Sequence, residues 1–288
     1  MARLSTDKLL QLFHEATYNC AVFDGSLLNL IITLLRFTCR VVAFLLSFFL
    51  VLPFVVVSIL LAKILGLKGL NQWVLKMWSR LLLGVCGLSV NIYGSLPKHP
   101  VFIVANHVSW LDIPIIHSLA LAGFVGKSEI KYWPILGWLA MLGDTVFIQR
   151  GNQNSRKLVI NSLIKRLKQG RSVAVFPEGK VTDGGHLGRF HRPLLQAAVE
   201  TKTPVVPIAI KFINQSGKRH ADVAFINDEW FIVHVCRILT LPSCAVEIHC
   251  GEGLVDGEDN LRLLTMQARD FVEQKLSEND YLSAQHTT

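Results

Sequence analysis

A histidine and an aspartate five positions apart are the residues best suited to chemistry in this sequence. His107 and Asp112 follow a short apolar run, 101–105, which has the length and composition of a buried strand. A carboxylate that contacts one ring nitrogen of a histidine raises the basicity of the other nitrogen and so prepares a general base for a hydroxyl group. Taken alone, the pair is also compatible with a structural histidine that caps a turn.

A second polar turn, Phe176-Pro177-Glu178-Gly179, follows another strand-like run, 172–176. The carboxyl ends of parallel strands meet at one edge of a sheet, where open α/β proteins bind their ligands. Glu178 and the backbone N–H groups of its turn are therefore expected to lie at the same edge as His107. Alone, Glu178 could be an ordinary turn or helix-capping carboxylate, but two polar turns at one edge predict a site.

Alternating strand-like and helix-like segments are expected to position these two turns. The predicted strands are 89–93, 101–105, 123–127, 145–148, 172–176, 205–212 and 246–250, and the predicted helices are 111–122, 155–169, 194–201 and 259–277. This alternation predicts an α/β fold with a mostly parallel sheet flanked by helices.

An apolar stretch before this domain predicts an N-terminal hydrophobic helical membrane anchor. Residues 27–67 are apolar on all faces, and 41–62 run without a charge for about the ~20 residues that span a bilayer. Arg36 and Arg40 lie in the first half and Pro53 in the second, which favours two helical pieces that cross the bilayer once or form a re-entrant hairpin. A buried core hairpin is the alternative.

The next segment has the composition of a helix at the lipid headgroup boundary. Residues 71–87 are amphipathic, with Trp73, Trp78, Lys76 and Arg80 at the positions that suit such a helix.

The net charge and the cysteine pattern indicate which partners and which redox compartment suit this chain. The formal charge of +8, from 29 Lys and Arg against 21 Asp and Glu, favours attraction to an anionic lipid surface. A nucleic-acid partner is disfavoured, because neither an Arg-rich recognition helix nor an RNA-binding strand pair is present. The six cysteines form no C-x-x-C pair and have no histidine at metal spacing, which predicts buried thiols in a reducing compartment and no metal site.

A hydrolase is the nearest rival enzyme class, since the His-Asp pair could activate Ser109 or Ser128. The sequence contains no Gly-x-Ser-x-Gly elbow for such a nucleophile. Nucleotide binding is also disfavoured, because no glycine-rich phosphate loop follows a strand.

Four blocks, in order, resemble the glycerolipid acyltransferases typified by 1-acylglycerol-3-phosphate acyltransferase. The blocks are Asn106–Asp112 within Asn-His-x-Ser-x-x-Asp, Gly126–Ile130 with Trp133–Gly137 and Phe147–Arg150, Phe176–Gly179, and Val205–Ile208. The resemblance covers roughly residues 70–253. It implies that His107 is the general base and that Asp112 orients its ring.

The resemblance also implies a binding role for residues around this pair. Glu178 and Gly179 would contact the glycerol and head group of the acceptor. Lys127 and Arg150 would meet an anionic head group or phosphate, although both could be solvated surface charges. The implied donor is acyl-coenzyme A or acyl-carrier protein, and no cofactor or metal is implied.

One block departs from the family pattern. Many members continue the third block with Thr-Arg-Ser, whereas this chain has Lys180-Val181-Thr182. Lys180 could replace the missing arginine as a point charge, without its bidentate phosphate contact. Residues 183–185, 190–192 and 194–198 resemble the branch that includes bacterial lyso-ornithine lipid acyltransferases.

These observations predict a membrane-bound O-acyltransferase of phospholipid biosynthesis whose acceptor is 1-acylglycerol-3-phosphate, with lyso-ornithine lipid or another lysophospholipid as the alternative. A non-catalytic lipid-binding membrane module is the alternative of another class, which the intact pair disfavours. The expected domains are a polar extension without cleavable-signal features (1–26), the membrane-anchoring segment (27–68), the acyltransferase domain (69–277) and a flexible tail (278–288). The expected location is a bacterial inner membrane, with the catalytic domain on the cytoplasmic face.

Overall fold

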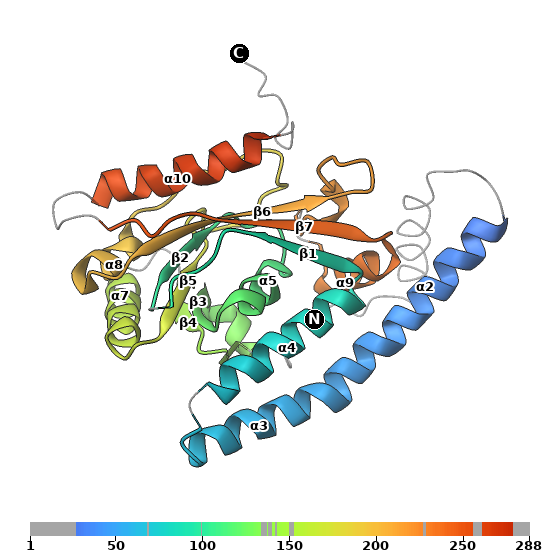
Figure 1. Ribbon diagram of the computed structural model, residues 1–288, viewed down its shortest axis with the longest axis horizontal. Coiled ribbons are helices and arrows are strands. Elements are labelled where there is room, and N and C mark those ends of the chain that lie inside the picture. Colours follow the sequence, from blue (N-terminus) through green and yellow to red (C-terminus); the bar gives the residue numbers. More distant parts are fainter. Residues whose placement is uncertain are drawn as a thin grey trace.

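A seven-stranded sheet forms the centre of the fold (Figure 1). The computed structural model describes residues 27–67, 69–98, 100–133, 137, 140–141, 143–149, 153–226, 229–255 and 261–278. The strands are β1 Leu88–Tyr93, β2 Phe102–Ala105, β3 Ala122–Lys127, β4 Val146–Ile148, β5 Ser172–Val175, β6 Val205–Ile213 and β7 Cys244–Cys250. Their order is β1-β7-β6-β2-β5-β3-β4, and only the β6–β7 pair is antiparallel. The predicted mostly parallel α/β sheet is confirmed.

Helices cover both faces of the sheet. One face carries α7 Gln153–Lys168, α8 Gln196–Thr201 and α10 Leu261–Ser277, and the other carries α4 Leu70–Val85, α5 Asp112–Leu119 and α9 Phe231–Thr240. Short helical turns occur at η2 Ser128–Tyr132, η3 Pro193–Leu195 and η4 Ala221–Val223. In Figure 1, α10 lies over β6 and β7, opposite α4.

The central strand β2 shows why two separate cores form. Successive side chains of a strand point to opposite faces, so Phe102 and Val104 pack with α7, α8 and α10, whereas Ile103 and Ala105 pack with α4, α5 and α9. All four are fully buried. Such continuous burial is typical of a parallel strand covered on both sides, and it holds the carboxyl end of β2 in a rigid position.

The apolar N-terminal stretch is a long helix. It consists of α2 Leu27–Leu46, a π-helical segment η1 Ser47–Val51 and α3 Leu52–Ile64, and its part Leu27–Ala62 is long and apolar enough to cross a membrane by length and composition. The two expected helical pieces are one continuous helix, so neither the predicted re-entrant hairpin nor the core hairpin forms over 27–62. A π segment, where Leu52 N–H bonds to Ser47 O, precedes Pro53 instead of a break. Because proline lacks an N–H and crowds the preceding turn, a wider turn accommodates it without ending the helix.

The long helix contacts the rest of the protein at both of its halves. Val55 and Ile59 of α3 pack on Val74 of α4, and Trp78 Nε1 donates to Ser47 Oγ at 3.2 Å. In α2, Arg40 Nη1 donates to Leu241 O at 2.5 Å, at the C-terminal end of α9, where free carbonyls and the helix dipole favour a cation. The positive charge of Arg40, which lies inside the apolar stretch, is therefore bonded to a distant part of the fold.

Two element predictions needed correction. The helix predicted over 111–122 ends at Leu119, because Ala122 already begins β3. Helix α9 was not predicted at all. The predicted tail lies outside the described residues apart from Glu278, as does the start of the helix predicted at 259.

Candidate active site

His107 and Asp112 are in contact at the carboxyl end of β2. His107 follows the strand, and Asp112 is the first residue of α5, so one tight turn brings them together. His107 Nδ1 lies 2.8 Å from Asp112 Oδ2. The aspartate side chain is fully buried, whereas the imidazole is 18% exposed. The imidazole can therefore meet a ligand while its partner cannot.

Backbone groups fix the aspartate. Asp112 Oδ2 accepts hydrogen bonds from Val108 N at 2.7 Å and Ser109 N at 2.9 Å. These donors and the N-terminus of α5 stabilise its negative charge. An ionised carboxylate only accepts, so His107 Nδ1 must carry the proton in this contact, and Nε2 is left as the basic nitrogen.

The second predicted turn holds the backbone of His107. Glu178 Oε1 accepts from His107 N at 2.9 Å, and Glu178 Oε2 accepts from Gly188 N at 2.8 Å. Thr182 N donates to His107 O at 2.8 Å. Burial raises the pKa of Glu178, while the hydrogen bonds from His107 and Gly188 oppose that rise. Glu178 thus joins the two turns through backbone contacts.

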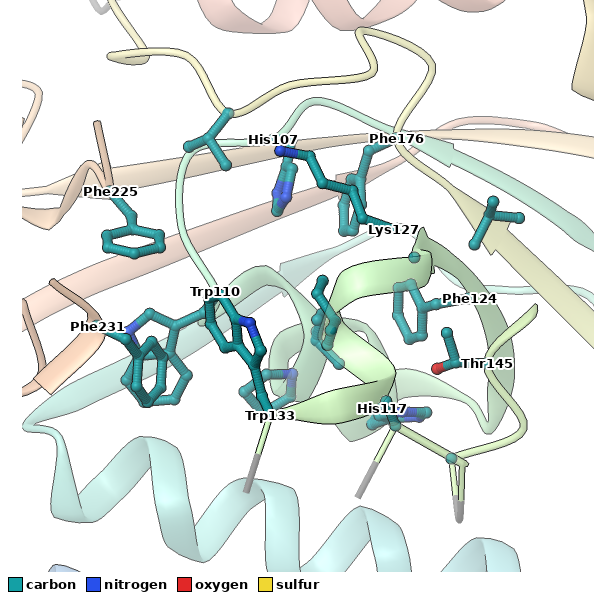
Figure 2. Close-up of a pocket in the computed structure, with 18 of the residues that line it drawn as sticks. His107, Trp110, His117, Phe124, Lys127, Trp133, Thr145, Phe176, Phe225 and Phe231 are labelled. Atoms are coloured by element: carbon teal, nitrogen blue, oxygen red, sulfur yellow. The ribbon is translucent and has the colours of Figure 1, made fainter. Parts of the chain in front are cut away.

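A row of aromatic rings extends from His107 (Figure 2). The imidazole stacks on Phe176 with centroids 4.0 Å apart. Phe176 stacks on Phe124 at 5.7 Å, and Phe124 meets His117 edge-on at 5.1 Å. These contacts fix the plane of the His107 ring.

The four rings line a large, mostly apolar cavity. Its volume is about 1160 Å³, above the range of roughly 300–1,000 Å³ of ordinary ligand pockets. Its wall runs from β3 and β5 to α3 and α4, and includes Leu52, Val56, Leu75 and Leu82. The long N-terminal helix therefore supplies part of the cavity wall.

The remaining predicted site residues lie partly on this cavity. Lys127, Gly179 and Lys180 line it, as His107 does. Gly179 has φ of +70°, a conformation that favours glycine. Glu178 reaches the site through the backbone of His107. Arg150 lies outside the described residues.

Comparison with known proteins identifies the family. The Acyltransferase family profile matches residues 89–211. A lyso-ornithine lipid O-acyltransferase of Pseudomonas aeruginosa is 38% identical over 203 residues, which cover 70% of this chain and 78% of that protein. The chain belongs to the acyltransferase family.

Two further likenesses agree with this assignment. A 1-acyl-sn-glycerol-3-phosphate acyltransferase of Neisseria meningitidis is 29% identical to this acyltransferase over 213 residues, covering 72% of this chain and 80% of the relative. The crystal structure of the 1-acyl-sn-glycerophosphate acyltransferase from Thermotoga maritima has a TM-score of 0.64 at 20% identity, and covers 86% of this chain and 98% of that one. The latter likeness concerns the fold.

Several aromatic residues that line the cavity of this acyltransferase were not predicted from the sequence. Trp110, Phe225 and Phe231 line the cavity beside His107. Trp110 Nε1 donates to His234 Nδ1 at 3.0 Å, and His234 Nε2 lies 3.1 Å from Val223 O. Burial lowers the pKa of His234 to about 4, so the ring is neutral and accepts the bond from Trp110.

Helix α9 carries His234 and was detectable. Phe231, Val235, Ile238 and Leu239 have the i, i+4, i+7, i+8 spacing of an apolar helix face. The helix has only 10 residues, and an apolar run that short fits a buried strand as well as a helix.

Proposed function

We propose that this acyltransferase moves a fatty acyl chain from a thioester carrier, acyl-coenzyme A or acyl-carrier protein, to the hydroxyl of a lysolipid. The observation that carries the proposal is the His107–Asp112 contact on the wall of a cavity that is apolar and large enough for an acyl chain. The relatives named for lyso-ornithine lipid and for 1-acyl-sn-glycerol-3-phosphate support a lysolipid acceptor.

The proposed reaction is a direct transfer. His107 Nε2 takes the proton of the acceptor hydroxyl while the hydroxyl oxygen attacks the thioester carbonyl carbon. Collapse of the tetrahedral species forms the ester, breaks the C–S bond and releases the thiolate, which takes the proton back from the imidazolium. Asp112 stabilises the imidazolium in between. Because the acceptor oxygen attacks directly, the route needs neither an acyl-enzyme nor a metal.

In this proposal Glu178 acts by positioning. Its two carboxylate oxygens accept backbone hydrogen bonds from His107 and Gly188, which leaves it poorly placed for the acceptor contact expected from the family resemblance. Gly179 and Lys180 lie on the cavity wall instead, and we assign the acceptor contact to them and to Lys127.

The charges along the cavity favour an acceptor with a zwitterionic head group. Among the described charged residues that line it, Lys127 and Lys180 are basic, and Glu129, Asp183 and Glu229 are acidic, with Glu229 already paired to Arg237 at 2.7 Å. A lyso-ornithine lipid carries one ammonium and one carboxylate, so both signs find a partner, whereas a phosphate would also meet the carboxylates. We therefore propose lyso-ornithine lipid as the acceptor, a choice that the 38% identical relative supports. Because Lys127 and Lys180 can pair with a phosphate, 1-acylglycerol-3-phosphate is the second candidate acceptor.

The long N-terminal helix is the proposed membrane anchor. Leu35, Phe49 and Phe54 are among its side chains that are 60% or more exposed, and water is a poor solvent for such a surface. Since α3 also lines the cavity, a membrane-bound helix would bring the cavity to the bilayer where lysolipids reside. We propose that the catalytic domain faces the cytoplasm at a bacterial inner membrane.

Acyl transfer by the purified, detergent-solubilised protein tests the proposal. Labelled acyl-coenzyme A and acyl-carrier protein are offered with lyso-ornithine lipid, 1-acylglycerol-3-phosphate, other lysophospholipids and glycerol 3-phosphate, and His107→Ala serves as the blank. Transfer to lyso-ornithine lipid is expected. Efficient transfer to 1-acylglycerol-3-phosphate alone would reverse the assignment of the acceptor, and transfer to none would favour a non-catalytic lipid-binding module.

A further inference from the structure

Two polar atoms in the apolar part of the cavity lack a hydrogen-bond partner among the described residues. They are Nδ1 of His117 and Oγ of Ser79. The residues are 7% and 0% exposed, and both line the cavity. Buried polar groups are almost always hydrogen bonded, because an unmade bond costs free energy. The two atoms thus lack the partner that a folded chain usually supplies, and the cavity that their residues line is the place where a bound molecule would supply it.

The chemistry of His117 restricts that partner to a hydrogen-bond donor. Burial lowers the pKa of His117 to about 4, and a hydrogen bond to the Ala120 backbone opposes this only in part. The ring is neutral at physiological pH, and Nδ1 is its unbonded nitrogen. With the ring proton on the other nitrogen, Nδ1 can only accept. The Ser79 hydroxyl can donate or accept, so a hydroxyl group is able to pair with either atom.

Two neighbouring helices present these atoms. Ser79 belongs to α4 and His117 to α5. Lys76, one turn before Ser79, donates to Leu119 O at 3.5 Å, which ties the two helices together at this level. The cavity wall around them is apolar, with Leu75, Leu82 and Ile113. A polar pair in such surroundings would select among chains that are otherwise alike.

The row of rings connects this pair to the reacting end of the site. His107 contacts Phe176, Phe176 contacts Phe124, and Phe124 contacts His117 (Figure 2). All four line the same cavity. A chain whose reacting carbon lies at His107 would pass Phe176 and Phe124 before it reaches His117.

We propose that His117 and Ser79 form a recognition site for a hydroxyl group carried by a fatty acyl chain, at a carbon away from the reacting end. The inference rests on the proposed function, in which an acyl chain occupies this cavity. The chain can be that of the thioester donor or that of the lysolipid acceptor, and the chemistry recognised is the same.

Competition between matched donors tests the site. The value of kcat/KM is measured for a plain acyl-coenzyme A and for its isomers with one hydroxyl near the thioester, at mid-chain or at the far end. In a second arm, the donor is plain and the acceptor chain carries or lacks an additional hydroxyl, remote from the hydroxyl that is acylated. The readout is the ratio of kcat/KM for the hydroxylated substrate to kcat/KM for the plain substrate, taken within each protein. A general loss of activity in a variant lowers both values and leaves the ratio unchanged.

The variants are His117→Phe, which keeps the ring beside Phe124, and Ser79→Ala. Ser118→Ala is the matched control, because Ser118 is equally buried but its hydroxyl already donates to Ile115 O at 2.6 Å. The wild type is expected to prefer one hydroxylated isomer by roughly fivefold or more, the worth of a single net hydrogen bond. Each test variant should lose most of that preference, and the control should keep it.

A ratio near one in the wild type, or a ratio that neither test variant changes, would overturn the proposal and leave the two atoms to ordered water. Thermal shifts with the free hydroxylated and plain fatty acids separate this outcome from failure of the proposed function. Suppose that no lysolipid is acylated but that the hydroxylated acid stabilises the wild type more than it stabilises His117→Phe. That result would support the hydroxyl-binding site and contradict the proposed acyl transfer. Equal thermal shifts in the wild type and in His117→Phe would contradict the proposed hydroxyl-binding site.

Discussion

At the scale of single residues, the proposed reaction depends on one imidazole nitrogen, Nε2 of His107. We expect His107→Ala to abolish acyl transfer, and Asp112→Asn to lower kcat by roughly a hundredfold to ten-thousandfold, the usual contribution of an oriented general base. The reason is that Asp112 holds the proton on Nδ1 and leaves Nε2 basic. Steady-state rates check this, with circular dichroism to verify folding. A comparable loss in His249→Ala, a histidine that stacks on Tyr93 instead, would contradict a specific role for His107.

Glu178 gives a second prediction at this scale. In Glu178→Gln one oxygen can still accept from the backbone, but the amide NH₂ faces a second N–H donor, at either His107 or Gly188. We expect kcat to fall by roughly tenfold, because His107 shifts, while the acceptor KM changes little. Glu200→Gln, at an exposed residue on α8, is the control. A rise in acceptor KM at constant kcat would instead indicate that Glu178 contacts the acceptor directly.

At the scale of elements, we expect the buried His234 of α9 to make the protein sensitive to acid. His234 has a pKa of about 4 in the folded chain, against 6.5 for a free histidine. The unfolded chain therefore binds more protons between these values, and the free energy of unfolding falls as the pH drops from about 6.5 to about 4. His234 alone should cost about 2 kcal/mol at about pH 5. His117, with the same direction and value, adds a similar loss.

Denaturant unfolding at neutral pH and at about pH 5 measures this loss. His234→Asn should be less stable than the wild type at neutral pH but should lose less stability on acidification. His186→Asn, at a side chain that is 59% exposed, should keep the wild-type difference. An equal pH dependence in His234→Asn would show that other groups cause the acid sensitivity.

At the scale of the whole molecule, the long N-terminal helix both lines part of the cavity and exposes apolar side chains. Phe54 and Leu61 are 70% and 50% exposed. We expect Phe54→Asp with Leu61→Asp to weaken binding to uncharged phosphatidylcholine vesicles by roughly a hundredfold or more, given the cost of a buried charge in a bilayer. Sedimentation with vesicles measures it.

The control for this experiment is Leu158→Asp, at a side chain on α7 that is also 67% exposed. It should bind vesicles like the wild type, because it lies on the helix layer across the sheet from α3 and α4. Unchanged binding of the double variant would contradict the proposed anchor.

The features that could be predicted from the sequence depend on residues that are close together along the chain. The contact between His107 and Asp112 spans one turn, and short apolar runs marked the strands with only small errors at their ends. Helix α9 was missed although its apolar spacing was present. The antiparallel β6–β7 pair could not be distinguished from sequence, because strand direction depends on how the chain returns to the sheet.

The sequence by itself determined the chemistry available and the edge of the sheet where it gathers, because both depend on residue type and on short-range periodicity. Only the tertiary structure decided that Glu178 holds the backbone of His107, across 71 residues of chain. It also decided that Trp110 bonds to His234 and that Ser79 and His117 share a cavity wall. These relations arise from the packing of segments distant in sequence, for which no local pattern carries a signal.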